Sequence, residues 1–330
     1  MSGPLRIGVI GATGGLGSEV LEVLSESSLS IGELVVTATE NSLGQDIEFQ
    51  GKIYPVLSDP PSLRGLDCLF LCAPGAASRE YAREALRAEV PCVDAAAALA
   101  GSPELPPRVA AFGAGERVPL LVAPSGPTLA LALALRPLQE AAGLRRIVAT
   151  CLDAASVGGR GGIETLYNES IALFNQEEPP DPEVFGRPVA FDCLPAQGDV
   201  DVSGATASER ATAAGLARLL GDGVGIGVTH LQVPTFVGFG ASVALETESA
   251  LDPTLAEGIL GKAPGIERWD DAPDGATLRA AAGRDVVLVG RVRQDPGADN
   301  GLLLWLACDT LRLAAANAVA LAAERFGQFH

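Results

Sequence analysis

The stretch "LRIGVIGATGGLGSEVLEVLSE" at residues 5–26 indicates how the first part of the chain folds. Its beginning, "LRIGVIG" at 5–11, is a short apolar run typical of a buried parallel strand. Gly11, Gly14 and Gly17 then follow at intervals of three residues and lead into a helical pattern of apolar side chains. This order of strand, glycine turn and helix predicts the opening unit of a nucleotide-binding domain.

The glycine turn has a physical role for each of its glycines. They permit a tight turn, a close approach of the backbone to a ligand, and close packing of the helix on the strand. The exposed helix N-terminus offers N–H groups to a phosphate. We therefore expect contacts to a dinucleotide from Gly11, Thr13, Gly14, Gly15, Leu16 and Gly17. The alternative is a turn that needs glycine for packing alone.

The end of the second expected strand, "ELVVTAT" at 33–39, bears on which dinucleotide is bound. An acidic residue near this place commonly contacts the ribose hydroxyls, and Thr39 and Glu40 occupy it. Glu40 would disfavour a 2′-phosphate, and no Lys or Arg follows before Lys52. The pattern slightly favours NAD over NADP, although Glu40 is equally well explained as a solvated loop carboxylate.

Further along the chain, strands and helices continue to alternate. Apolar runs at 66–74, 90–96 and 118–124 indicate strands, and 78–89 has a helical pattern. Such alternation predicts a Rossmann-like, doubly wound parallel sheet with helices on both faces. Ala73 and Gly75, at the end of one of these strands, are expected to contact the dinucleotide as well.

Beyond residue 128 the pattern changes to longer, partly alternating strands with fewer helices. The expected strands cover 144–156, 187–195, 224–236, 241–248, 284–294 and 301–309, and the expected helices cover 161–174, 207–220 and 252–261. This favours an α+β domain whose mixed sheet has helices on one face. An uncovered sheet face needs another cover, which predicts a homodimer that meets through this domain.

The expected organisation therefore has three parts. Residues 1–127 form the dinucleotide-binding domain, and residues 128–308 form the substrate and dimerisation domain. An Ala- and Leu-rich helix within 309–330 is expected to pack back on the first domain.

Composition narrows the classes of partner and site. In 330 residues, 23 Lys and Arg against 41 Asp and Glu give a net charge of −18, which repels nucleic acid and anionic lipid. No secretory leader or membrane span is evident, so a cytoplasmic protein is expected. The cysteines lie singly in apolar runs and the histidines are only His230 and His330, so no metal site is expected.

Three segments carry a resemblance to a known family. They are "RIGVIGATGGLGSEVLEVL" at 6–24, "VAFDCLPAQGDVDVSGAT" at 189–206 and "VVLVGRVRQDPGADNGLLLWLACDTLRLAAANAV" at 286–319. In order and spacing they resemble the aspartate-semialdehyde dehydrogenases over almost the whole chain. The resemblance implies a Rossmann domain, a dimerising domain and NADP-dependent reductive dephosphorylation of an acyl phosphate. It adds Gly158 and Asn317 to the expected cofactor contacts.

The resemblance also locates the catalytic positions, and this chain departs from the family at each of them. The family's nucleophilic cysteine lies in a turn that here reads "APSGPT" at 123–128, where Gly126 takes its place. The family's histidine base aligns with Phe239, and the arginine that holds the substrate carboxylate aligns with Gln232. A thiolate attack without its thiol or base is not possible. The resemblance thus implies a catalytically degenerate, Usg-like paralogue that binds a dinucleotide as a homodimer.

Other family positions have changed too. A second arginine is replaced near Ala100, and a helix that carries Glu and Lys in the family keeps only the basic position, with Gly215 and Arg218. A glutamine ahead of a glycine loop aligns with Asp153.

An alternative function is an active NAD(P)-dependent oxidoreductase with a different, less charged substrate. Ser125 or Thr128 could then supply a nucleophile or proton donor and Asp153 a base, yet each also suits a structural role: turn residue, helix N-cap and hydrogen-bonded carboxylate. The remaining candidates are Cys151 as a displaced thiol, Arg160 with Arg218 as an anion site, and His230 as a catalyst. We expect a buried thiol, surface arginines and a core or interface histidine instead.

Overall fold

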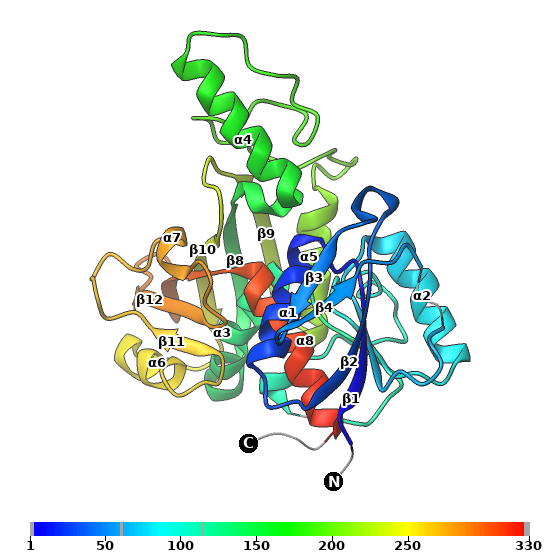
Figure 1. Ribbon diagram of the computed structural model, residues 1–330. Coiled ribbons are helices and arrows are strands. Elements are labelled where there is room, and N and C mark those ends of the chain that lie inside the picture. The colour runs from blue at the N-terminus through cyan, green and yellow to red at the C-terminus, as the bar shows by residue number, and fades with distance from the viewer. Residues whose placement is uncertain (1–2, 60–61, 114, 327–330) are drawn as a thin grey trace. The chain divides into compact units, whose positions relative to one another are not determined.

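The opening stretch forms β1 (Leu5–Ile10) and α1 (Gly15–Glu26) in the computed structural model, which describes residues 3–59, 62–113 and 115–326 (Figure 1). The chain divides into two units. Unit 1 comprises 1–126 and 314–330, and unit 2 comprises 127–313. Among the described residues, no helix is both long and apolar enough to cross a membrane.

Unit 1 is built on a parallel sheet of five strands in the order β2-β1-β5-β6-β7. The strands that join β1 are β2 (Ile31–Thr37), β5 (Cys68–Leu71), β6 (Cys92–Asp94) and β7 (Leu120–Val122). In register, Ile7 lies between Leu34 and Cys68. The predicted parallel sheet is confirmed.

Alternate side chains of these strands fill two cores, one on each face of the sheet. Ile7 and Phe70 pack with α1 and with Ala318 of α8 (Thr310–Phe326). On the opposite face, Leu69 and Leu71 pack with α2 (Gly75–Arg87). Successive strand residues point to opposite faces, so a strand covered on both sides is apolar throughout. The predicted return of the C-terminal helix to this domain is confirmed, and Figure 1 shows α8 beside α1.

A hairpin in unit 1 was not expected from the sequence. It joins β3 (Asp46–Phe49) to β4 (Lys52–Pro55) through Gln50 and Gly51, which both have positive φ. Two such residues in a row are typical of the tight turn that matches strand twist. Two short 3₁₀ helices, η1 (Glu40–Ser42) and η2 (Ala110–Phe112), lie elsewhere in this unit.

Unit 2 is built on a six-stranded mixed sheet in the order β11-β12-β13-β10-β8-β9. Its strands are β8 (Leu144–Asp153), β9 (Gly225–Gln232), β10 (Phe239–Thr247), β11 (Ile266–Arg268), β12 (Val287–Gln294) and β13 (Gly301–Cys308). Its helices are α3 (Gly126–Ala142), α4 (Gly159–Phe174), α5 (Ala207–Leu220), α6 (Pro253–Leu260) and α7 (Leu278–Ala281), with the 3₁₀ helix η3 (Ala155–Gly158). The β8/β9 and β11/β12 pairs are parallel and the others antiparallel, which confirms the predicted mixed sheet.

The prediction of a strand at 187–195 is wrong. Only an isolated antiparallel bridge from Leu194 to Gln232 forms there. The N–H groups of Val189 and Ala190 both donate to one carboxylate oxygen of Glu169 on α4, at 2.7 and 2.9 Å. The segment is apolar because it packs on α4. The Glu169 carboxylate accepts the backbone hydrogen bonds that a neighbouring strand would otherwise accept.

Candidate functional site

A cavity of about 350 Å³ opens at the carboxyl ends of β1 and β5 in unit 1. Strand order reverses at this pair, because β2 lies on one side of β1 and β5 lies on the other. Ligands of doubly wound sheets bind at such a reversal. The cavity is lined by Ile10, Gly11, Thr13, Gly14, Thr37, Ala38, Thr39, Ser58, Cys72, Ala73, Pro74, Ala77 and Tyr81.

Close packing explains two of the glycines in the turn. Gly11 has φ +81, and a Cβ on it would lie 2.9 Å from the Ala73 nitrogen. A Cβ on Gly17 would lie 2.1 Å from the Gly11 carbonyl oxygen, a distance that no side chain tolerates. The loops that follow β1 and β5 are thereby pressed together. The N-cap of α1, Gly14, has no side-chain cap, and the first turn of α1 has no acidic residue, so its N-terminus suits an anion.

The segment after β2 is joined to the glycine turn by a hydrogen bond of 3.0 Å between the hydroxyls of Thr13 and Ser42. Ser42 belongs to η1, which begins at Glu40. Thr39 lines the cavity, whereas Glu40 is exposed beside it. The predicted contact of Glu40 with a ribose stays a prediction.

The structure brings together many of the residues that were expected to hold a dinucleotide. Gly11, Thr13, Gly14, Thr39 and Ala73 line the cavity. Gly15, Leu16 and Gly17 lie in the first turn of α1, and Gly75 begins α2. Their contacts with a cofactor remain predictions, but their placement suits that role.

Two further predicted contacts lie elsewhere. Gly158 belongs to unit 2, where it lines a different cavity. Asn317 lies on α8, where its side-chain oxygen accepts the Ala110 N–H at 2.9 Å and its amide nitrogen donates to the Arg108 carbonyl at 3.3 Å. Part of the hydrogen-bonding capacity of Asn317 therefore fixes a neighbouring loop.

Tyr81 of α2 is a cavity residue that sequence reasoning missed. Its hydroxyl donates to a carboxylate oxygen of Asp59 at 2.7 Å. Burial, with the Asp59 carboxylate beside it, raises the pKa of Tyr81, so the phenol stays protonated. The helical pattern gave no signal for this position, because a tyrosine on a half-exposed helix face is ordinary.

In unit 2, the register of the strands aligns a second group of predicted residues. Asp153 at the end of β8 lies opposite Gln232 of β9 and Phe239 of β10. Cys308 of β13 lies opposite Phe239 in turn. Directly opposed residues point to the same face of a sheet. All four side chains are buried, and Phe239 is only 1% exposed.

Asp153 of this row forms a buried pair with His230, which lies two residues before Gln232 on β9 and opposite Cys151. The Asp153 carboxylate lies 2.6 Å from Nδ1 of His230, and Nε2 of the ring lies 3.1 Å from the Thr212 hydroxyl on α5. The His230 backbone N–H donates to the carboxylate of Glu209, also on α5. Both ring nitrogens are therefore engaged, as expected for a core histidine.

The side chain of Gln232 is hydrogen-bonded to the side-chain amide of Gln197. Its side-chain oxygen accepts from Nε2 of Gln197 at 3.0 Å. On α5, Gly215 packs against the side chain of Thr128, because a Cβ at Gly215 would lie 2.8 Å from the Thr128 methyl. Where the family resemblance leads one to expect an arginine, Gln232 thus forms an uncharged pair with Gln197. Where it leads one to expect a glutamate, Gly215 is tightly packed.

The thiols near these groups are poor nucleophiles. Burial raises the pKa of Cys151, and the Asp153 carboxylate raises it further. Burial likewise raises the pKa of Cys308, with Asp309 adding to the effect. A protonated thiol does not attack a carbonyl. Neither Cys151 nor Cys308 is therefore suited to act as a nucleophile.

The turn at 123–128 differs from expectation in one respect. Helix α3 begins at Gly126, two residues before the predicted cap Thr128. Thr128 is buried in the first turn and is not the N-cap, which corrects that prediction. Ser125 immediately precedes the helix. A glycine and a proline can start a helix, since proline suits the first turn.

The remaining candidates are dispersed. Arg160 lies near the start of α4 and Arg218 in the last turn of α5, both exposed. Among the described residues, no group of three or more His, Cys, Asp or Glu side chains could hold a metal ion. His330 lies outside the described residues.

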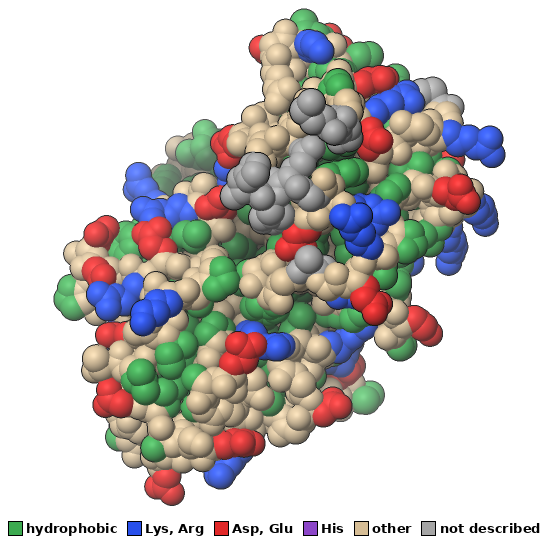
Figure 2. Space-filling view, turned by 90° about the horizontal axis from the view of Figure 1, so that it is seen from below, with side chains coloured by type: hydrophobic (Ala, Val, Ile, Leu, Met, Phe, Trp, Pro, Cys, Tyr) green, Lys and Arg blue, Asp and Glu red, His purple; other side chains and the backbone are tan. Residues whose placement is uncertain are grey.

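Two surface features lie apart from the predicted residues. On the face drawn in Figure 2, the acidic and basic side chains of the described residues are interspersed.

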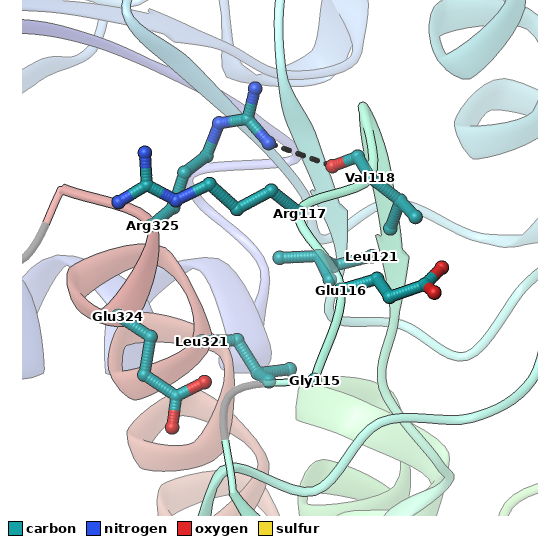
Figure 3. Close-up of a pocket in the computed structure, with 8 residues that line it drawn as sticks. All are labelled: Gly115, Glu116, Arg117, Val118, Leu121, Leu321, Glu324 and Arg325. Atoms are coloured by element: carbon teal, nitrogen blue, oxygen red, sulfur yellow. Dashed lines mark hydrogen bonds between the residues drawn. The ribbon is translucent and has the colours of Figure 1, made fainter.

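A cavity of about 160 Å³ lies near the start of β7, where Nη1 of Arg325 donates to the Val118 carbonyl at 2.7 Å (Figure 3). Glu324 also lines it, and burial raises the pKa of that carboxyl. It contains none of the expected cofactor residues.

Comparisons with known proteins agree with the fold. Residues 6–125 match the family described as semialdehyde dehydrogenase, NAD binding domain, and residues 135–313 match semialdehyde dehydrogenase, dimerisation domain. An aspartate-semialdehyde dehydrogenase of Aquifex aeolicus is 31% identical and covers 96% of each chain. A USG-1 protein homolog of Azotobacter vinelandii is 35% identical over 98% of each. A crystal structure of aspartate-semialdehyde dehydrogenase II from Vibrio cholerae has a TM-score of 0.92 at 28% identity, covering 99% of this chain and 100% of the other.

Proposed function

The chain belongs to the aspartate-semialdehyde dehydrogenase family, and we propose that it is a non-catalytic member that binds a dinucleotide as a homodimer. The observation that carries this proposal is the row of Gln232, Asp153 and Phe239. It lies in the sheet that should carry the family's base and substrate arginine, and it holds neither.

The chemistry of the family reaction explains why these substitutions matter together. A thiolate must attack the carbonyl, a base must take its proton, and cations must hold the charged substrate. Gly126 has no side chain, Phe239 has no titratable group, and Gln232 carries no charge. Because burial raises the pKa of Cys151 and of Cys308, neither of these two thiols is suited to take over the attack.

Dinucleotide binding is proposed to persist in unit 1. The cavity at the strand reversal, the fit of Gly11 and Gly17, and the free N-terminus of α1 support it. No Lys or Arg lines the cavity, and Glu40 is exposed beside it. These features favour a dinucleotide without a 2′-phosphate, so NAD is preferred over NADP here.

We expect the purified protein to bind NAD more tightly than NADP and to show no phosphate-dependent oxidation of aspartate semialdehyde. Calorimetric titration with each cofactor measures the first, and formation of NADH or NADPH in phosphate buffer with the corresponding cofactor measures the second. The Vibrio cholerae enzyme, assayed in parallel, provides the positive control. Turnover above background would refute the non-catalytic proposal, and absence of cofactor binding would refute dinucleotide retention separately.

An active oxidoreductase that uses a less charged substrate is the second candidate function. The retained cavity in unit 1 and the neutral surroundings of Gln232 favour it. A screen of uncharged aldehydes and alcohols with NAD separates the two, since only this second function gives a change in absorbance at the NADH band.

The homodimer is proposed to form through unit 2, and its α4 provides a suitable surface. Tyr167, Ile171 and Phe174 lie one helical turn or two apart on α4 and are 57%, 44% and 74% exposed. The Phe174 ring stacks edge to face on Phe191, itself exposed, at 5.4 Å. A contiguous exposed apolar stripe of this kind marks an interaction site. Figure 1 shows α4 extending from the end of β8 and β9.

Replacement of Phe174 by aspartate should therefore shift the protein from dimer to monomer. A charge placed in a buried apolar contact is left unpaired, which weakens association by about tenfold or more. Light scattering coupled to gel filtration should give twice the 33.7 kDa chain mass for the unmodified protein and less for the variant. Leu86→Asp on α2 of unit 1 is the matched control and should stay dimeric. An unchanged mass for Phe174→Asp would exclude this surface.

A further inference from the structure

A separate cavity of about 190 Å³ lies within unit 2, beside the end of β9. It is lined by apolar side chains that include Val157, Val184 and Phe185, and by the amides of Gln197 and Gln232. None of its lining residues is charged. The cavity uses no residue of unit 1, and Gly158 is the one predicted dinucleotide contact among its lining residues.

The polar end of this cavity is rigidly built. Gln232 is fully buried, with 0% of its surface exposed. Its backbone exchanges two hydrogen bonds with Leu194, at 3.0 and 2.9 Å, and pairs with Asp153 on its other side. The Glu169 carboxylate holds Val189 and Ala190, which fixes the segment that leads from Phe185 to Leu194.

The apolar wall is equally well defined. A Cβ at Gly158 would lie 2.7 Å from Val184 and 3.2 Å from the Phe185 ring. The loop that carries these two side chains therefore packs directly on η3. A wall held in this way keeps the shape of the cavity without a ligand.

The hydrogen-bonding capacity of the two amides is only partly used. A glutamine amide has two N–H donors and an oxygen with two acceptor sites. Gln232 accepts one bond from Gln197, and its own amide nitrogen reaches only the adjacent Val233 carbonyl, at a long 3.4 Å. The Gln197 oxygen has no hydrogen-bond partner among the described residues. The buried amide nitrogen of Gln232 can therefore donate to a ligand, and the nearby oxygen of Gln197 can accept from one. Leaving a buried polar group without a hydrogen bond costs free energy, which favours binding of such a ligand.

From this arrangement we propose that the cavity binds a small uncharged molecule that carries a carboxamide on an apolar chain. A carboxamide matches an amide pair because it both donates and accepts. The apolar chain packs against Val157, Val184 and Phe185. A carboxylate of the same shape is excluded, because its charge would be buried without a cation among the lining residues. This site goes beyond the dinucleotide-binding function proposed above and does not depend on it.

Saturation-transfer difference NMR with isobutyramide and isobutyrate, without any dinucleotide, tests the proposal. We expect saturable binding of isobutyramide and at least roughly tenfold weaker binding of isobutyrate. Gln232→Leu should lower isobutyramide binding about tenfold, whereas Gln294→Leu at the exposed end of β12 should leave it unchanged. Thermal unfolding of each variant verifies the fold, and Gln197→Leu replaces Gln232→Leu if the latter fails to fold.

Gln232→Arg supplies a gain-of-function test. A guanidinium in the cavity should reverse the preference in favour of isobutyrate. Equal binding of amide and acid by the unmodified protein, no saturable binding of the amide, or unchanged binding by a folded Gln232→Leu or Gln197→Leu variant would overturn the proposal. Binding of isobutyramide that persists in a variant unable to bind NAD separates this site from the function of unit 1.

Discussion

Replacement of Gly17 by alanine is expected to weaken dinucleotide binding and to destabilise unit 1. The new Cβ would lie 2.1 Å from the Gly11 carbonyl oxygen and 2.7 Å from the Ala12 Cα, so α1 must move away from β1. Both contacts are with backbone, which cannot rotate aside as a flexible side chain can. We expect a loss of about 2 to 3 kcal/mol in the free energy of unfolding and at least a tenfold loss of NAD affinity.

Gly14→Ala provides the matched control within the same turn. Gly14 has φ −75, and the nearest atom to its Cβ is the Gly11 oxygen at 3.4 Å, so stability should change by no more than about 0.5 kcal/mol. A fall in NAD affinity without a fall in stability would show that Gly14 serves the ligand and not the packing. Urea unfolding and calorimetric titration measure the two quantities. Equal stability of Gly17→Ala and Gly14→Ala would contradict the packing argument.

The second large effect is expected from Asp153→Ala. This change removes the acceptor 2.6 Å from Nδ1 of His230 and leaves a 2% exposed imidazole without its partner. Loss of one member of a buried pair costs about 3 kcal/mol, because the remaining polar group cannot reach water. The free energy of unfolding in urea should fall by that amount.

Thr212→Val is the control for the other side of the imidazole. It removes one hydrogen bond of 3.1 Å and keeps the volume of the side chain, so it should cost about 1 kcal/mol. A double variant tests coupling, since residues in one network show non-additive effects. A loss below about 1 kcal/mol for Asp153→Ala would mean that the pair does not contribute to stability as argued.

The fold could be predicted to a large extent, for reasons that particular elements make clear. The apolar run of β1 and the helical pattern of α1 are local features of the sequence. The fold class of unit 1 follows from the alternation of strands and helices, and that of unit 2 from its longer strands with fewer helices between them. The failures come from non-local contacts. The segment at 187–195 has a strand-like pattern, yet Glu169 takes its N–H groups. Thr128 looks like a helix cap, but α3 begins at Gly126.

The candidate site could be predicted only in part. Gly11, Thr13 and Gly14 were identified because the glycine spacing encodes their role, and they do line the cavity. Tyr81 lines the same cavity and carries no such signal. In unit 2, the family resemblance singled out Phe239 and Gln232, whereas their burial and their partners could not be read from the sequence.

The glycine turn, the alternation of elements and the residue types of Gly126, Phe239 and Gln232 could all be read before folding is considered, because each is local or follows from the resemblance. Only the tertiary structure decided that His230 pairs with Asp153, 77 positions away, and that Gln232 pairs with Gln197, 35 positions away. The physical reason is register. The parallel pairing of β8 with β9 sets Cys151 opposite His230 and Asp153 opposite Gln232, and no local pattern of residues specifies which rungs of two distant strands will meet.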